Sequence, residues 1–235
     1  MASGCDRDQE PSRPVRQLTP IEARVLGVLV EKQATVPDTY PLSLNALVAG
    51  CNQKTARDPV LAASEGEVQA AVDALKLLSL AFESSGSRVS RYEHNLGRAL
   101  SLPSQSVALL AVLMLRGPQT ISELRANCER LHRFADVSAV EGFLDELAAR
   151  PEEKGGPLVV RLARAPGARE ARWAQLLTGP VDAAMAAAGA SDDEDFVAVS
   201  ELAALKARLS AAEAEIAALR SQLDRVCAEL DIPRS

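Results

Sequence analysis

The residues of this chain that could do chemistry are cations in predicted loops and hairpins. Guanidinium and ammonium groups on such segments bind phosphate through charge, and arginine adds paired hydrogen bonds. If the protein binds DNA, we expect these groups to contact the backbone of a duplex, with weak sequence preference and strong salt dependence. The candidate residues are Lys54, Arg57, Arg88, Arg91, Arg161, Arg164, Arg169 and Arg172.

The same cations also have a purely structural interpretation. Arginines on exposed hairpins are commonly solvated, and they discourage strand pairing with other chains. In the loop NQKTARDPV, Arg57 could pair with Asp58 and hold the loop against its domain instead of binding a ligand. The sequence leaves both interpretations open.

Motifs for catalysis or for metal binding are missing from the sequence. It contains no G-x-S-x-G, P-loop or H-E-x-x-H pattern. The four cysteines lack the spacing of metal ligands, which argues against a zinc site. They are also scattered and unpaired in spacing, so we expect reduced thiols in a cytoplasmic protein. We therefore expect no enzyme activity, no cofactor and no metal. His94 and His132 are expected at the surface or in packing, and Cys51 and Cys128 in the core; Cys5 and Cys227 complete the set.

The elements that must position the cations come from an internal repeat. Apolar residues recur at helical spacing in three pairs of segments. Capping boxes are predicted at Thr19, Ser64 and Thr120, where a hydroxyl and a glutamate three residues later satisfy the first amides of a helix. The aligned segments are 18–32 with 102–116, 43–51 with 120–128, and 64–75 with 136–147.

Each set of three helices is followed by a hairpin pattern, with turns expected at Ser85-Gly86 and at Pro166-Gly167. Three helices and a hairpin make a winged helix, although a generic helical bundle with two hairpins is an alternative. The predicted fold is mainly α with small β-hairpins. Its parts are a disordered tail (1–16), winged-helix domains (17–100 and 101–177), a flexible acidic linker (178–200) and a coiled-coil helix (201–231).

The third helix of each unit has the wrong charge to lie in a DNA groove. Carboxylates close to phosphates are repelled, and the link from Asn52 to Ala63 is longer than the usual turn of a helix-turn-helix. Both features weaken docking of the third helix in a groove, whereas a protein-interaction scaffold tolerates acidic third helices. The polar residues of these helices are Glu65, Glu67, Gln69 and Asp73 in the first unit, and Asp136, Glu141, Asp145 and Glu146 in the second.

A heptad pattern near the C-terminus predicts a dimer seam. Charges flanking the seam are complementary for a parallel pair, as in Arg208 with Glu213. The alternative is one amphipathic helix that folds back onto its own domain, and the pattern does not fix the oligomer number. The apolar seam positions are Leu202, Leu205, Leu209, Ile216, Leu219, Leu223, Val226 and Leu230.

The block LTPIEARVLGVLVEKQATVPDTYPLSLNALVAGCNQKTARDPV, with SRVSRYEH, LRGPQTISELR and PLVVRLARAPGARE further on, resembles the YceH-type family of uncharacterised bacterial proteins. The resemblance covers residues 17 to about 177. It implies a tandem winged-helix fold, often with a short coiled-coil tail, and it implies no known activity.

Together these patterns favour a non-enzymatic, DNA-associated regulator. The alternative is a scaffold that binds other proteins and no DNA. The net charge of −6 does not decide between them, because residues 181–235 carry 5 basic and 11 acidic side chains while the preceding part is nearly neutral. We expect double-stranded DNA or other proteins as partners, a homodimer through the C-terminal helix, a cytoplasmic location and no membrane segment.

Overall fold

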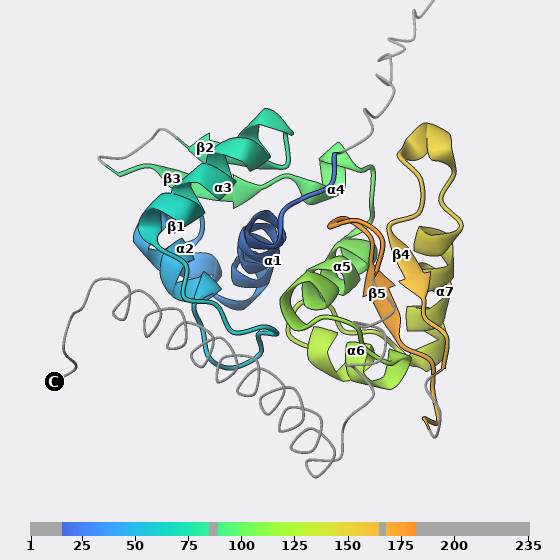
Figure 1. Ribbon diagram of the computed structural model, residues 1–235. Helices are drawn as coiled ribbons and strands as arrows, with labels where there is room; N and C mark the ends of the chain where they lie inside the picture. Colours follow the sequence, from blue (N-terminus) through green and yellow to red (C-terminus); the bar gives the residue numbers. More distant parts are fainter. Residues whose placement is uncertain (1–15, 85–88, 165–167, 182–235) are drawn as a thin grey trace, which may run out of the picture. The chain divides into compact units, whose positions relative to one another are not determined.

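A computed structural model describes residues 16–84, 89–164 and 168–181 (Figure 1). These residues are mainly helical with small antiparallel sheets, as predicted. Most of the predicted linker, the coiled-coil helix with its dimer seam, and Arg88 lie outside the described residues. Among the described helices, none has the length and apolarity needed to cross a membrane.

The first half, residues 17–100, contains three principal helices and a three-stranded antiparallel sheet. The strand order is β1-β3-β2, and Tyr92 of β3 faces both Leu42 of β1 and Glu83 of β2. Its elements are α1 (Pro20–Thr35), η1 (Pro37–Thr39), β1 (Leu42–Ser43), α2 (Leu44–Cys51), α3 (Glu65–Leu77), β2 (Ala81–Ser84), β3 (Arg91–His94) and α4 (Leu96–Ala99).

The second half, residues 101–177, repeats the three helices and an antiparallel strand pair. Val160 of β4 faces Ala174 of β5. Trp173 on β5 is buried and also bridges to Gln119, which ties the strand pair to the segment before α6. The elements are α5 (Ser104–Arg116), α6 (Ile121–Cys128), α7 (Val137–Ala148), η2 (Glu152–Lys154), β4 (Val159–Arg161) and β5 (Trp173–Gln175).

The predicted capping boxes are confirmed at all three positions. In each, a hydroxyl of the residue before the helix accepts from the third helical amide, and the glutamate there accepts from the cap's own amide; the pairs are Thr19–Glu22, Ser64–Glu67 and Thr120–Glu123. Each cap contributes about 1 kcal/mol. Asp136 caps α7 by accepting from the amide of Ala139 at 2.8 Å. The acidic residues at these helix starts therefore have a structural role.

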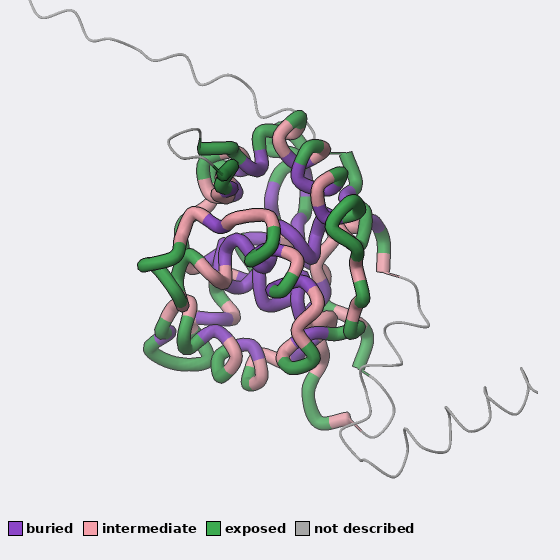
Figure 2. Tube along the Cα trace, turned by 90° about the vertical axis from the view of Figure 1, so that its left-hand side faces the viewer, coloured by how far each residue is buried: buried purple, intermediate pink, exposed green. Residues whose placement is uncertain are grey.

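The two halves share one hydrophobic core, in which α1 and α5 lie side by side (Figure 1). Residues 22–30 of α1 and 106–115 of α5 are all buried. A Cβ atom added at Gly27 would lie 2.9 Å from Cγ of Leu115, so the glycine permits this close approach. Figure 2 shows the buried segments gathered inside this unit. All described residues belong to one compact unit, and the predicted boundary at residue 100 therefore runs through a continuous core.

Candidate functional site

Three of the eight candidate cations gather at one hollow in the second half. Arg161 ends β4, and Arg164 and Arg169 follow it in the segment leading to β5. Together with the first residues of α6 and α7 they line an open hollow of about 380 Å³. We call it the hairpin hollow; it is lined by Ile121, Val137, Arg161, Arg164, Arg169, Glu170 and Ala171.

Arg161 is held at the edge of the hairpin hollow by two weak contacts. Its Cζ atom lies 5.9 Å from the ring centre of Trp173, and its Nη1 atom lies 4.0 Å from Oε1 of Glu141. Both charged side chains of the ion pair are about half exposed, so the pair contributes little free energy. The guanidinium therefore remains able to bind an anion from solution.

Arg172 has a different role, because its guanidinium turns toward the start of α6. It donates to the carbonyl of Pro118 at 3.0 Å and to Oε1 of Glu123 at 3.4 Å. Glu123 also completes the capping box of α6. Arg172 therefore fastens the strand pair to α6, and it does not line the hairpin hollow.

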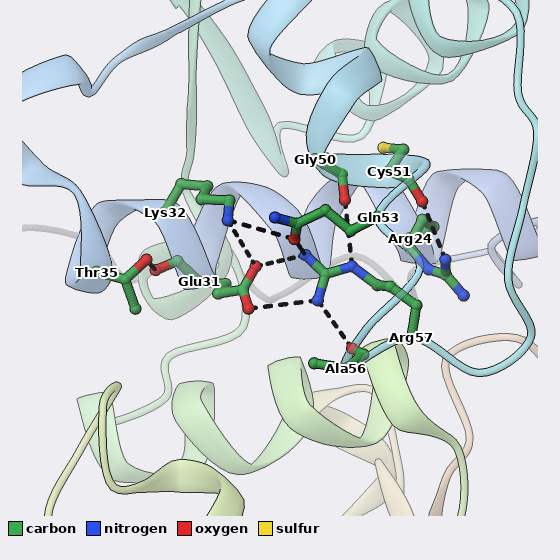
Figure 3. Close-up of polar contacts among 9 residues, drawn as sticks. All are labelled: Arg24, Glu31, Lys32, Thr35, Gly50, Cys51, Gln53, Ala56 and Arg57. Atoms are coloured by element: carbon green, nitrogen blue, oxygen red, sulfur yellow. Dashed lines mark hydrogen bonds and ion pairs between the residues drawn. The ribbon is translucent and has the colours of Figure 1, made fainter.

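Arg57 is buried at the centre of a polar network in the first half (Figure 3). Nη1 and Nη2 donate to the two carboxylate oxygens of Glu31 at 3.3 and 2.5 Å, and Nε donates to the carbonyl of Gly50 at 3.2 Å. The remaining bonds go to the carbonyl of Ala56 and to Oε1 of Gln53. With its donors occupied and its side chain covered, Arg57 cannot reach a phosphate in this conformation.

The carboxylate partner of Arg57 is Glu31 on α1, where the sequence suggested Asp58. Burial alone raises the pKa of Glu31, but the hydrogen bonds and charge of Arg57, helped by Lys32, outweigh burial and lower that pKa below its usual value. The backbone amide of Asp58 donates to the carbonyl of Leu115 at 2.8 Å. The loop is therefore held to α1 by the arginine and to α5 by its backbone.

Sequence reasoning missed two residues that hold this loop in place. Arg24 on α1 is buried and donates to the carbonyls of Cys51 and Pro59 at 3.1 and 2.6 Å. Asn52 joins the loop's ends, because its amide donates to the carbonyl of Ala63 and accepts from the amide of the same residue, both at 2.8 Å. An arginine within the apolar run of α1 was the available signal for a buried polar contact.

The other two described candidates are separate from the hairpin hollow. Lys54 is exposed in the loop. Arg91 is exposed on β3 and donates to the carbonyls of Pro41 and Thr39 at 2.9 and 3.4 Å. Neither residue lines the hairpin hollow, so the structure brings together only Arg161, Arg164 and Arg169 among the described candidates.

Burial shifts the pKa values of the described cysteines and of His94. Cys51 and Cys128 are fully buried at matching places on α2 and α6, as predicted, and burial raises the pKa of each thiol to about 12. Burial lowers the pKa of His94 to about 4. Across the described ranges, no three His, Cys, Asp or Glu side chains gather as a metal site.

Comparisons with known proteins place this architecture in a bacterial family. A UPF0502 protein of Leptothrix cholodnii is 63% identical over 219 residues, which cover 92% of this chain and 97% of the relative. A UPF0502 protein of Burkholderia vietnamiensis is 59% identical over 226 residues, which cover 96% of this chain and 94% of the relative. The model of the family described as "Protein of unknown function, DUF480" matches residues 18–168. The resemblance to an uncharacterised bacterial family is thus confirmed, and the chain belongs to the DUF480 family.

Proposed function

We propose that this protein is a tandem winged-helix protein that binds the phosphate backbone of duplex DNA through its second strand pair. Each half has three helices followed by paired antiparallel strands, the element order of a winged helix. Strands and loops of such folds grip the backbone while another element reads bases. Here the backbone grip is the main source of affinity.

The observation that carries the proposal is the gathering of Arg161, Arg164 and Arg169 around the hairpin hollow. Three guanidinium groups around one open concavity favour an anion with several oxygens, because arginine binds phosphate through paired hydrogen bonds. Val137, the first residue of α7, lines the same hollow and is 41% exposed. A backbone seated there would pass the start of α7, where the exposed Asp136 and the Glu141 carboxylate paired with Arg161 oppose it.

Binding of a fluorescent duplex, measured by anisotropy from 50 to 200 mM salt, tests the proposal. We expect wild-type protein to bind at low salt, and Arg164→Ala/Arg169→Ala to flatten the slope of log affinity against log salt by about 1.8, since each phosphate contact contributes roughly 0.9. The control Arg98→Ala/Lys154→Ala removes the same charge from exposed side chains outside the hollow. The proposal is contradicted if wild-type protein does not bind the duplex at low salt. It is also contradicted if the control flattens the slope as much as Arg164→Ala/Arg169→Ala, because the effect would then come from the net charge and not from the hollow.

A second candidate function, a protein-binding scaffold, is favoured by apolar side chains in the first half. Leu77 at the end of α3 is 88% exposed, Phe82 on β2 is 44% exposed, and Val89 before β3 is 57% exposed. Exposed apolar side chains of this size are more typical of contact with protein than with phosphate. If the wild-type protein does not bind the duplex at low salt, the protein-binding scaffold remains as the candidate function.

We also propose that the protein forms a homodimer, which the heptad pattern of residues 201–231 supports. Two linked copies would present two hairpin hollows to one duplex, and linkage raises the overall affinity without any new contact. Such multivalency suits sites that each bind weakly to the backbone.

A further inference from the structure

A second arginine-lined hollow lies on the exposed side of α6. It has a volume of about 240 Å³ and is built from α6 and from the segment between α6 and α7. We call it the α6 hollow. Its lining residues are Ser122, Arg125, Ala126, Glu129, Arg133 and Phe134.

Ring packing of Phe134 and one hydrogen bond of Arg125 hold the segment that carries the two arginines of the α6 hollow. Phe134 is buried, and its ring makes edge contacts with two other rings. The ring centroids lie 4.9 Å apart for His132 and 6.0 Å apart for Phe143. The guanidinium of Arg125 donates from Nη2 to the carbonyl of Ala135 at 3.3 Å. This contact uses one N–H group of Arg125, and the other N–H groups can bind a ligand. Arg133, the residue before Phe134, is exposed.

One side-chain contact links the α6 hollow to the hairpin hollow. The hydroxyl of Ser122, which lines the α6 hollow, lies 3.3 Å from both carboxylate oxygens of Glu170, which lines the hairpin hollow. The hollows are therefore neighbours, with arginines on both sides of this contact. A carboxylate at the junction repels an anion that passes over it.

We propose that the DNA backbone extends from the hairpin hollow across the Ser122–Glu170 contact into the α6 hollow, where Arg125 and Arg133 bind a second group of phosphates. This inference rests on the proposed function and adds a contact surface that the loop and hairpin cations did not include. The ligand is a phosphodiester chain, because a single small anion would fill one hollow and gain nothing from the other. Glu170 limits the affinity by repelling the chain between the hollows, and Glu129, which lines the α6 hollow, does the same there.

The test uses the full chain and the anisotropy titration described above. We expect Arg125→Ala/Arg133→Ala to flatten the salt slope by about 1.8, because each arginine that no longer binds a phosphate reduces the slope by roughly 0.9. The control Arg98→Ala/Lys154→Ala should keep the wild-type slope. Thermal melts followed by circular dichroism confirm that each variant is folded, which is expected because the replaced side chains are exposed.

A second variant tests the junction in the opposite direction. Glu170→Gln keeps the size of the side chain and a hydrogen bond to Ser122 but removes the negative charge, so we expect binding to tighten several-fold at 50 mM salt. An unchanged slope for Arg125→Ala/Arg133→Ala, with a flattened slope for Arg164→Ala/Arg169→Ala, overturns the extended path and leaves the proposed function standing. Wild-type protein that binds no duplex at low salt overturns both.

Discussion

Arg57 shows how a cation in a polar loop can serve the fold instead of a ligand. Its guanidinium joins the end of α2, the loop and Glu31 on α1. Removing one partner of a buried ion pair leaves the other charge uncompensated, which costs about 3 kcal/mol or more. For a unit of this size such a loss lowers the midpoint of thermal unfolding by roughly 6–12 °C.

We therefore expect Arg57→Ala to lower that midpoint while Lys54→Ala, three residues away and exposed, leaves it unchanged. Circular dichroism melts of both variants at pH 7 make the comparison. Arg57→Lys should recover little of the lost stability, because an ammonium cannot reproduce the fork of donors toward Glu31 and Gly50. Equal melting of Arg57→Ala and wild type would contradict the structural role.

We expect protonation of His94 to reduce the stability of the protein in mild acid. Its Nδ1 atom accepts from the amide of Leu96 at 3.4 Å, so Nε2 carries the proton and donates to Oε1 of Gln33 at 2.8 Å. Protonating Nδ1 would break the first contact. Because burial lowers the pKa of His94 to about 4, below an unfolded value of about 6.5, the stabilisation is complete above pH 6.5 and is lost as the pH falls toward 4.

Urea unfolding at pH 7, 5.5 and 4.5 measures this loss, which reaches up to about 3 kcal/mol at the acid end. His94→Gln should show a weaker pH dependence than wild type over this range. If His94→Gln retained the full acid loss, other groups would have to account for it.

At the scale of elements, the contact between α1 and α5 holds the two halves together. Gly27 is buried, and an added Cβ would meet Leu115 at 2.9 Å. We expect Gly27→Val to destabilise the protein by about 1–3 kcal/mol, because extra methyl groups in a packed core force neighbours apart. Gly142 on α7 is the matched control, since nothing lies within 4 Å of its added Cβ.

Gly142→Ala should therefore stabilise the protein by up to about 1 kcal/mol, the helix-propensity difference between the two residues. Chemical denaturation of both variants gives the two signs. Loss of stability in Gly27→Val without loss of cooperativity would agree with a single core across both halves. Two separate unfolding transitions in wild type would contradict it.

The sequence predicted the helices and small antiparallel sheets, whereas the contact between α1 and α5 is seen only in the structure. Capping residues and apolar spacing are local signals, so the helices and strand pairs came out as expected. The two-residue strand β1 is too short to show alternation. The runs around Val25–Val30 and Val107–Leu115 are apolar on every side, which is typical of helices buried all round, and this signal could have predicted the α1–α5 contact. The burial of Arg57 depends on Glu31 and Gly50, which only tertiary structure brings to it.

At the scale of the whole molecule, the predicted dimer decides how many arginine hollows one particle carries. The seam lies outside the described residues, and the heptad pattern of residues 201–231 is the observation that supports it. Leu209 and Ile216 occupy successive a positions, where a charge would face its counterpart on the partner helix. We expect Leu209→Glu/Ile216→Glu to convert a dimer into a monomer in sedimentation equilibrium.

Ala214→Glu provides the control, because position f points away from a coiled-coil seam. The monomeric variant should also bind a duplex long enough for two copies at least tenfold more weakly than wild type, since linked sites gain affinity through effective concentration. On a duplex that accommodates a single copy, both proteins should bind alike. A variant that is monomeric yet binds the long duplex as tightly as wild type would separate self-association from DNA binding and remove multivalency from the proposal.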